Sequence, residues 1–138
     1  MVDEDMMVEE ILNVIKLCKR YNDIFILDGF PRHMDQYRAI SNIGMRLRYY
    51  YITADVSSRI RRMRNRGRDV ADTNDDAIRS RIVYYYNTTL PMIQHIIRNE
   101  AISIYDNYES DTVDTICLIC DRIIYDIRSC NNGEIDDK

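Results

Sequence analysis

Apolar positions recur at three- and four-residue steps in several stretches of the chain, which is the spacing of one face of an α-helix. The clearest stretch covers residues 8–21, where acidic residues come before the apolar positions and basic residues after them, as the helix dipole favours. The same spacing predicts further helices over four ranges: 35–43, 59–67, 77–98 and 112–127. Ser57 or Ser58 is expected to cap the helix that starts at Arg59, and Pro91 to kink or divide the longest one.

Three short apolar runs alternate with these helices. They lie at 24–27, 49–53 and 101–105 and are rich in Ile, Phe and Tyr. Runs of this length and composition are typical of buried β-strands. The alternation predicts an α/β fold, with a parallel sheet flanked by helices. In such sheets ligands bind at the carboxyl ends of the strands.

Composition and charge exclude several classes of function. Of the 138 residues, 46% are hydrophobic and 30% charged, and the net charge of −4 gives no general attraction to nucleic acid or to an anionic membrane. No apolar run approaches the roughly 20 residues of a membrane span, and the acidic start is unlike a signal peptide. We therefore expect a cytoplasmic protein with no nucleic-acid or membrane partner.

The first stretch with candidate chemistry follows the predicted strand at 24–27 and reads LDGFPR from Leu27 to Arg32. Gly29 allows a sharp exit from the strand, and a rigid backbone presents Arg32 as a two-pronged donor to phosphate or carboxylate. Asp28 lies where a metal ion or its water shell could be held. The pattern is equally compatible with an ordinary turn that carries a surface arginine and a capping aspartate.

Six arginines occur within ten residues, with no acid among them: Arg59, Arg61, Arg62, Arg64, Arg66 and Arg68. On a helix, Arg62 and Arg66 share one face, where like charges repel. An anion or nearby carboxylates should therefore neutralise them. For an isolated run of arginines, the favoured alternative is a solvated helix balanced by aspartates, here Asp69, Asp72, Asp75 and Asp76.

Cys117 and Cys120 lie three residues apart in an apolar helical pattern. No second pair of cysteines and no histidine lies near them in the sequence. We therefore expect them to pack in the core rather than to serve zinc or redox chemistry.

Taken in order, these features resemble the nucleoside monophosphate kinases, specifically the adenylate kinases, over about residues 2–125. The resemblance implies a P-loop NTPase-like fold and phosphate transfer from ATP to AMP with Mg²⁺, which Asp28 would contact through water. It implies that Gly29 and Arg32 bind the AMP phosphate and that Gln36 reads adenine. It also implies that Arg62 and Arg66, at the start of the lid, contact the base and phosphates of the donor, and that Arg81 clasps the transferring phosphate.

The chain departs from the family pattern in two places. Residues 67–76 resemble the short lid of the small family members, but the usual lid arginine falls at Val70. The family's first strand and its Gly-x-x-Gly-x-Gly-Lys phosphate loop have no counterpart in the sequence. Since that loop cradles the donor phosphates, we expect the 138-residue chain to be inactive by itself.

Two hypotheses follow. In the first, residues 1–130 are the carboxyl-terminal part of an adenylate kinase-like enzyme, with a polar tail at 131–138. In the second, the chain is a non-catalytic kinase-like subunit with a structural or regulatory role. In either case the strands at 24–27 and 49–53 flank the position of the absent strand, so we expect self-association or a protein partner that supplies it.

Overall fold

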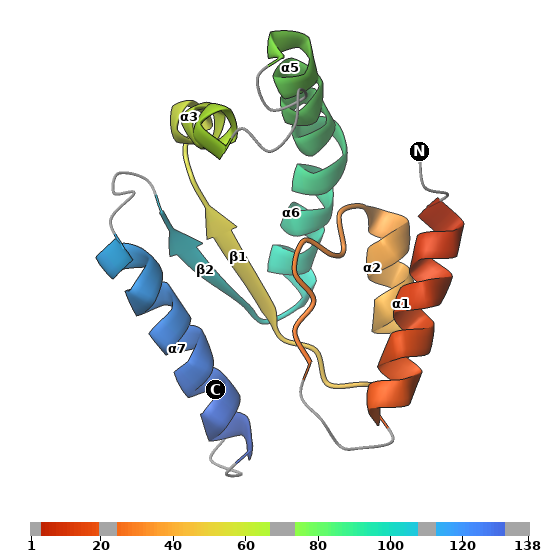
Figure 1. The fold of residues 1–138 in the computed structure, drawn as a ribbon. Coiled ribbons are helices and arrows are strands. Elements are labelled where there is room, and N and C mark those ends of the chain that lie inside the picture. Colours follow the sequence, from red (N-terminus) through yellow and green to blue (C-terminus); the bar gives the residue numbers. More distant parts are fainter. Residues whose placement is uncertain (1–3, 20–24, 67–73, 108–112, 132–138) are drawn as a thin grey trace. The chain divides into compact units, whose positions relative to one another are not determined.

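The computed structural model describes residues 4–19, 25–66, 74–107 and 113–131. By the contacts within the chain it divides into two compact units, Met1–Tyr49 with Arg79–Ala101, and Tyr50–Ile78 with Ile102–Lys138. Figure 1 shows the elements, which in chain order are α1 (Glu4–Lys19), α2 (Met34–Ser41), β1 (Tyr49–Thr53), α3 (Val56–Arg66), α5 (Asp75–Tyr84), the π-helix η1 (Tyr85–Thr89), α6 (Leu90–Asn99), β2 (Ile102–Asp106) and α7 (Val113–Asn131).

The fold is α/β, as the alternation of patterns predicts. β1 and β2 form a two-stranded parallel sheet (Figure 1). Both strands lie within one residue of the predicted ranges. Directly after β2, the backbone N–H of Asn107 donates to the carbonyl oxygen of Thr53 at 2.8 Å, which continues the ladder to the carboxyl edge. In the described part of the chain each strand pairs only with the other, so each keeps one open edge.

The prediction of a strand at 24–27 is wrong for the residues that are described. Phe25, Ile26 and Leu27 have no regular secondary structure, and Ile24 lies outside the described residues. A strand is defined by hydrogen bonds to a neighbouring strand, which apolar composition alone does not supply. The segment instead lines, with four residues of α1, an open apolar hollow of about 230 Å³, and Ile26 is 73% exposed.

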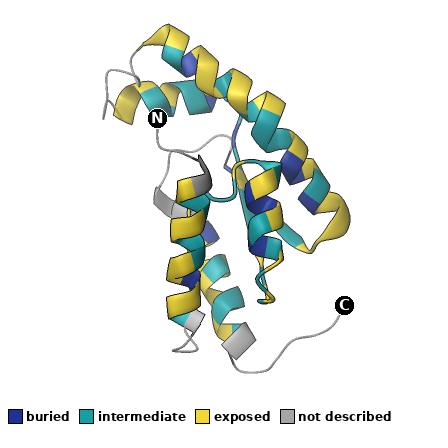
Figure 2. Cartoon of the chain, turned by 90° about the vertical axis from the view of Figure 1, so that its right-hand side faces the viewer, coloured by how far each residue is buried: buried dark blue, intermediate teal, exposed yellow. Residues whose placement is uncertain are grey.

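Three helices of the first unit, α1, α2 and α6, each bury apolar residues on one side. α1 and α2 lie side by side (Figure 1), and Ile15 of α1 and Ile40 of α2 are each 2% exposed. α6 buries Met92, Ile93 and Ile96. Figure 2 shows that exposed positions occupy the other side of these helices. Burial of one apolar stripe per helix thus forms the core of this unit.

The helical stretch predicted over 77–98 is divided by η1, which ends two residues before Pro91, and Pro91 itself lies in the first turn of α6. Between α5 and α6 the five residues of η1 widen the turn, and the N–H of Leu90 donates to the carbonyl of Tyr85, five residues back. Proline has no N–H and its ring crowds the preceding turn of an α-helix. A short π-helical segment before Pro91 accommodates both effects.

The cap of α3 differs from the prediction. The helix begins at Val56, and Asp55 rather than Ser57 or Ser58 caps it, since the Asp55 Oδ1 accepts the backbone N–H of Ser58 at 2.8 Å. Aspartate is as good an acceptor at this position as serine. Ser58 is instead one of the buried residues, with 4% exposure.

α7 extends to Asn131, so the first residue of the predicted polar tail is helical, and 132–138 lie outside the described residues. The prediction that Cys117 and Cys120 pack in the core is wrong, because both are exposed. Ile119 between them is the buried residue, at 9% exposure. A helix at a surface buries one stripe, and the two cysteines lie outside it. Over the described ranges, no helix is long and apolar enough to cross a bilayer.

Candidate functional site

The residues that follow Leu27 form a turn that leads into α2. Gly29 has a φ of +69°, a left-handed conformation that side chains with a Cβ rarely adopt. The Nε of Arg32 donates to the carbonyl oxygen of Gly29 at 2.6 Å. A Cβ atom at position 29 would lie 3.0 Å from a terminal nitrogen of Arg32. Both the backbone conformation and the close approach of the Arg32 side chain therefore favour glycine here.

Gln36 holds the other side of the same turn. It lies in the first turn of α2, is 1% exposed, and its Oε1 accepts the backbone N–H of Arg32 at 2.7 Å. A glutamine at the third helical position commonly reaches back to an N–H before the helix, as in a capping box. His33, the N-cap residue, makes no side-chain capping hydrogen bond. The structure thus brings together Gly29, Arg32 and Gln36, and their role in binding AMP stays a prediction.

Arg32 is an exposed cation that is oriented without being neutralised. Its Nε is held by a carbonyl oxygen, and none of the described residues accepts a hydrogen bond from its terminal nitrogens. By contrast, Arg38 on α2 pairs with Asp35 at 3.0 Å, and both side chains are largely exposed. Such a surface pair contributes little to stability. The guanidinium of Arg32 is therefore available for bidentate bonds to an anionic oxygen pair.

Asp28 lies at the start of this turn and is exposed. Nowhere in the described ranges do three metal-ligating side chains gather. Mg²⁺ usually keeps several waters and is held by one or two carboxylates together with substrate phosphates. Asp28 thus forms no metal centre with other side chains of the described residues, and its contact to Mg²⁺ through water stays a prediction.

Two arginines of α3 reach the carboxyl edge of the sheet in the second unit. The Nε of Arg59 donates to the carbonyl of Ala54 at 2.7 Å, and Arg62 donates to the carbonyl of Asn107 at 3.1 Å. Ala54 and Asn107 directly follow β1 and β2. Parallel sheets bind ligands at this edge. Arg62 thus lies where the sequence analysis expects a ligand.

Asn107 is a candidate functional residue at this edge of the sheet that the sequence analysis did not identify. Asn107 is 8% exposed, and among the described residues its buried Oδ1 has no hydrogen-bond partner. Burial of such an oxygen is costly unless a partner satisfies it. The signal in the sequence is a polar residue directly after the apolar run at 101–105.

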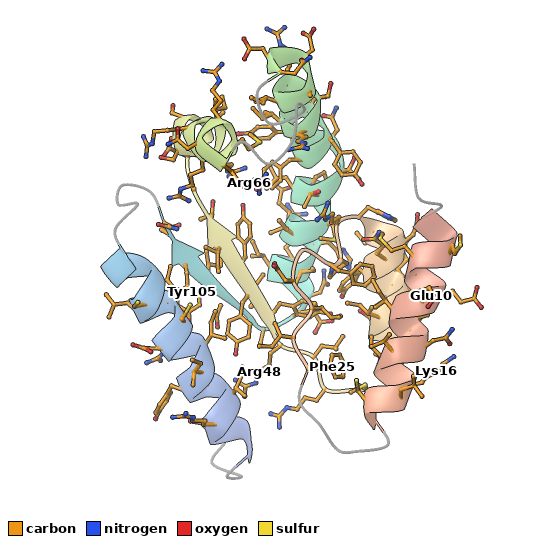
Figure 3. The ribbon with its side chains drawn as sticks, in the orientation of Figure 1. Glu10, Lys16, Phe25, Arg48, Arg66 and Tyr105 are labelled. Atoms are coloured by element: carbon orange, nitrogen blue, oxygen red, sulfur yellow. The ribbon has the colours of Figure 1, made fainter. Side chains whose placement is uncertain are left out.

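The sequence analysis left two interpretations of the arginine run, an anion-binding cluster and a solvated helix balanced by aspartates. The other arginines differ in which one they fit. Arg64 forms an exposed ion pair with Asp75 at 2.7 Å, as expected of a solvated helix balanced by aspartates. Arg66 is exposed at the end of α3 (Figure 3). Arg81 is exposed on α5, in the first unit. Arg62 and Arg66 belong to the second unit, so their combination with Arg32 in one site stays a prediction.

Most of the predicted lid, residues 67–76, lies outside the described residues. Its last residues start α5: the Oδ1 of Asn74 accepts the N–H groups of Asp76 at 2.9 Å and of Ala77 at 3.2 Å. Asn74 is therefore the N-cap of this helix. The acidic side chains of Asp75 and Asp76 complement the helix dipole in its first turn.

Comparisons with known proteins agree with the motif. The chain is 30% identical over 112 residues to an adenylate kinase of Prochlorococcus marinus (strain MIT 9515). This alignment covers 78% of this chain and 59% of the relative. It is 38% identical over 78 residues to an adenylate kinase of Corynebacterium glutamicum (strain R), covering 51% and 41%. It is 31% identical over 81 residues to UMP-CMP kinase 3 of Oryza sativa subsp. japonica, covering 57% and 39%. No family model matches the chain.

The chain spans roughly half the length of the curated relatives that it matches. Those relatives differ in the base that their names give, adenine in some and uracil or cytosine in others. What they share is the class of enzyme. Over the part of the chain that they cover, these matches support the nucleoside monophosphate kinase family.

Proposed function

We propose that this chain binds the acceptor nucleotide of an adenylate kinase-type reaction, in which phosphate passes from ATP to AMP to give two ADP. The observation that carries the proposal is the orientation of Arg32 by Gly29 and Gln36, with its terminal nitrogens left for an anion. Phosphoryl transfer depends mainly on positioning and on charge stabilisation. A cation held rigidly at the acceptor phosphate supplies both.

In this proposal the terminal nitrogens of Arg32 donate charge-assisted hydrogen bonds to the AMP phosphate. Arg62 and Arg66 contact the base and phosphates of the donor, and Arg81 clasps the transferring phosphate. When bound with ATP, Mg²⁺ neutralises charge on the donor phosphates, and Asp28 contacts it through water.

Gln36 supports the choice of AMP as the acceptor. Its amide nitrogen donates to no described residue, whereas its oxygen is held by the N–H of Arg32. An amide can donate to a ring nitrogen of adenine. The proposal therefore assigns the amide of Gln36 to the base and the guanidinium of Arg32 to the phosphate.

Binding of AMP to matched arginine variants tests the proposal. We expect AMP to bind the 138-residue chain at about millimolar concentration, and Arg32→Met to weaken binding about tenfold or more, because a charged hydrogen bond contributes roughly 1.5 to 3 kcal/mol. Arg38→Met, which removes an exposed arginine of α2 already paired with Asp35, is the control. Calorimetric titration that gives equal affinity for both variants would contradict the proposal.

A second candidate is a kinase-like subunit that binds nucleotide without catalysis. It is favoured by one observation: no Gly-x-x-Gly-x-Gly-Lys segment occurs in the 138 residues. Such a loop supplies the backbone N–H groups and the lysine that hold the donor phosphates. Both candidates require the acceptor site, and they differ in whether phosphate is transferred.

A further inference from the structure

We infer that Gln36 is a positioning residue for Arg32, through its side-chain oxygen, in addition to any contact with a base. The inference rests on the proposed function for its ligand, but the geometry that supports it is independent of any ligand. In this inference the oxygen and the nitrogen of the Gln36 carboxamide have different roles. The oxygen orders the turn that presents Arg32, and the amide nitrogen is left for the nucleotide.

The first support is the hydrogen bond itself. At 2.7 Å between the Arg32 nitrogen and the Gln36 Oε1, it is short for an N–H to oxygen bond. Gln36 is 1% exposed, so water does not compete for this oxygen. The bond is part-buried, with its acceptor on the buried side, and its loss would remove the hydrogen bond that ties the backbone of Arg32 to α2.

The second support is that two contacts hold Arg32 in the turn, one through its side chain and one through its backbone. The side chain of Arg32 bonds back to the carbonyl of Gly29 at 2.6 Å, while its backbone N–H bonds forward to Gln36. The backbone and the guanidinium of Arg32 are therefore fixed by two separate contacts. Without the Gln36 contact, the backbone that carries the Arg32 side chain would lose its bond to α2, and the exposed bond from Arg32 to Gly29 would have to order the turn without it.

The inference also limits how Gln36 can read a base. An amide group distinguishes adenine best when its oxygen and nitrogen both face the base edge. Here the oxygen is occupied by the N–H of Arg32, so the amide nitrogen is the group left to meet the base. Gln36 should thus affect binding of the phosphate as well as recognition of the base.

Two ligands separate positioning from base recognition: AMP, and ribose 5-phosphate, which has no base. The variant Gln36→Met has a similar length but no hydrogen-bonding group, and Gln94→Met on α6, where Gln94 is exposed, is the matched control. We expect Gln36→Met to weaken binding of ribose 5-phosphate by roughly 3- to 10-fold, because the hydrogen bond to the Arg32 backbone is lost, and binding of AMP by at least as much. Weakened AMP with unchanged ribose 5-phosphate would overturn the inference and leave Gln36 as a base contact alone.

A measurement on the unmodified chain gives a second readout, which does not depend on the variant folding or on ligand binding. Nuclear magnetic resonance detects scalar coupling across a hydrogen bond, here from the Arg32 backbone nitrogen to the Gln36 Cδ. We expect this coupling, together with restricted motion of the Arg32 Nε in ¹⁵N relaxation. Absence of the coupling, with a freely moving Nε, would overturn the inference. If neither ligand binds while the coupling is present, the proposed acceptor site fails and the positioning contact stands.

Discussion

The side chain of Arg32 folds back over Gly29, so that its Nε lies 2.6 Å from the Gly29 carbonyl oxygen and a terminal nitrogen 3.0 Å from the place of a Cβ at position 29. The absence of a side chain at one residue thus shapes the position of a cation three residues later. Gly44 offers a comparison, since its φ of +65° is similar but nothing lies within 4 Å of its Cβ position.

Gly29→Ala and Gly44→Ala should therefore lose similar stability but differ in ligand binding. Each places an alanine in the left-handed region, which costs about 1 to 2 kcal/mol. Only Gly29→Ala displaces the guanidinium of Arg32, so only this variant should bind AMP more weakly. Urea unfolding and AMP titration of both variants check this. Equal AMP affinity in the two variants would show that contact with Gly29 does not position Arg32.

The cap of α3 predicts a specific acid dependence of stability. Hydrogen bonds from the hydroxyl and the backbone N–H of Ser58 hold the pKa of the Asp55 carboxyl below its ordinary value. A pKa lowered by folding stabilises the protein above the unfolded pKa, about 3.9, and this contribution is lost as the pH falls through the folded value.

Asp55→Asn keeps an oxygen acceptor but cannot titrate, so the difference in unfolding free energy between it and the original chain should shrink as the pH falls below about 4. Urea unfolding followed by circular dichroism at a series of pH values measures this difference. A difference that is constant over the same range would show that the carboxylate of Asp55 is not the titrating cap.

The sequence predicts most of the elements because their signals are local. Periodicity gives the helices α1 and α2, and short apolar runs give β1 and β2 to within one residue. The predicted strand at 24–27 does not form in the described residues because a strand also needs a neighbouring strand to bond with, and a local sequence pattern does not show whether one is present. The prediction that Cys117 and Cys120 pack in the core is wrong for a related reason: the sequence of an apolar helix does not show which of its faces is buried.

For the candidate site, residue types could be predicted but not their contacts. The LDGFPR motif and its resemblance identify Gly29, Arg32 and Gln36. That the oxygen of Gln36 bonds to the backbone of Arg32 depends on where α2 begins, and helix boundaries are set by caps that sequence locates only to within a few residues. Asn107 was missed because its burial depends on tertiary packing.

The open strand edges predict self-association. Among the described residues β1 and β2 pair only with each other, and Ile52 and Ile104 are about half exposed. Exposed apolar edge strands pair with other chains, and a lysine on an edge opposes this. Sedimentation velocity should show species larger than a monomer, reduced by Ile52→Lys but not by Val83→Lys, which alters an exposed residue of α5. A monomer at all concentrations would contradict this expectation.

The 138-residue chain should show no turnover of ATP and AMP to ADP above background. No glycine-rich phosphate loop occurs among these residues, so the donor phosphates are not cradled. A coupled assay measures ADP formation, and the Arg32→Met variant sets the background. Turnover within the common enzyme range of about 1 to 10³ per second would contradict the expectation and favour a catalytic chain over a non-catalytic subunit.

The central claim, an acceptor phosphate site at the turn before α2, is tested most directly by mapping AMP binding residue by residue. Amide chemical shifts in ¹H–¹⁵N spectra, recorded during a titration with AMP, locate the ligand without any substitution. The account predicts that the shifts cluster at Gly29, Arg32 and Gln36, and that they are smaller with CMP and UMP. Shifts confined to residues 59–66, or equal responses to all three monophosphates, would contradict it and show that the arginines of α3 merely attract anions.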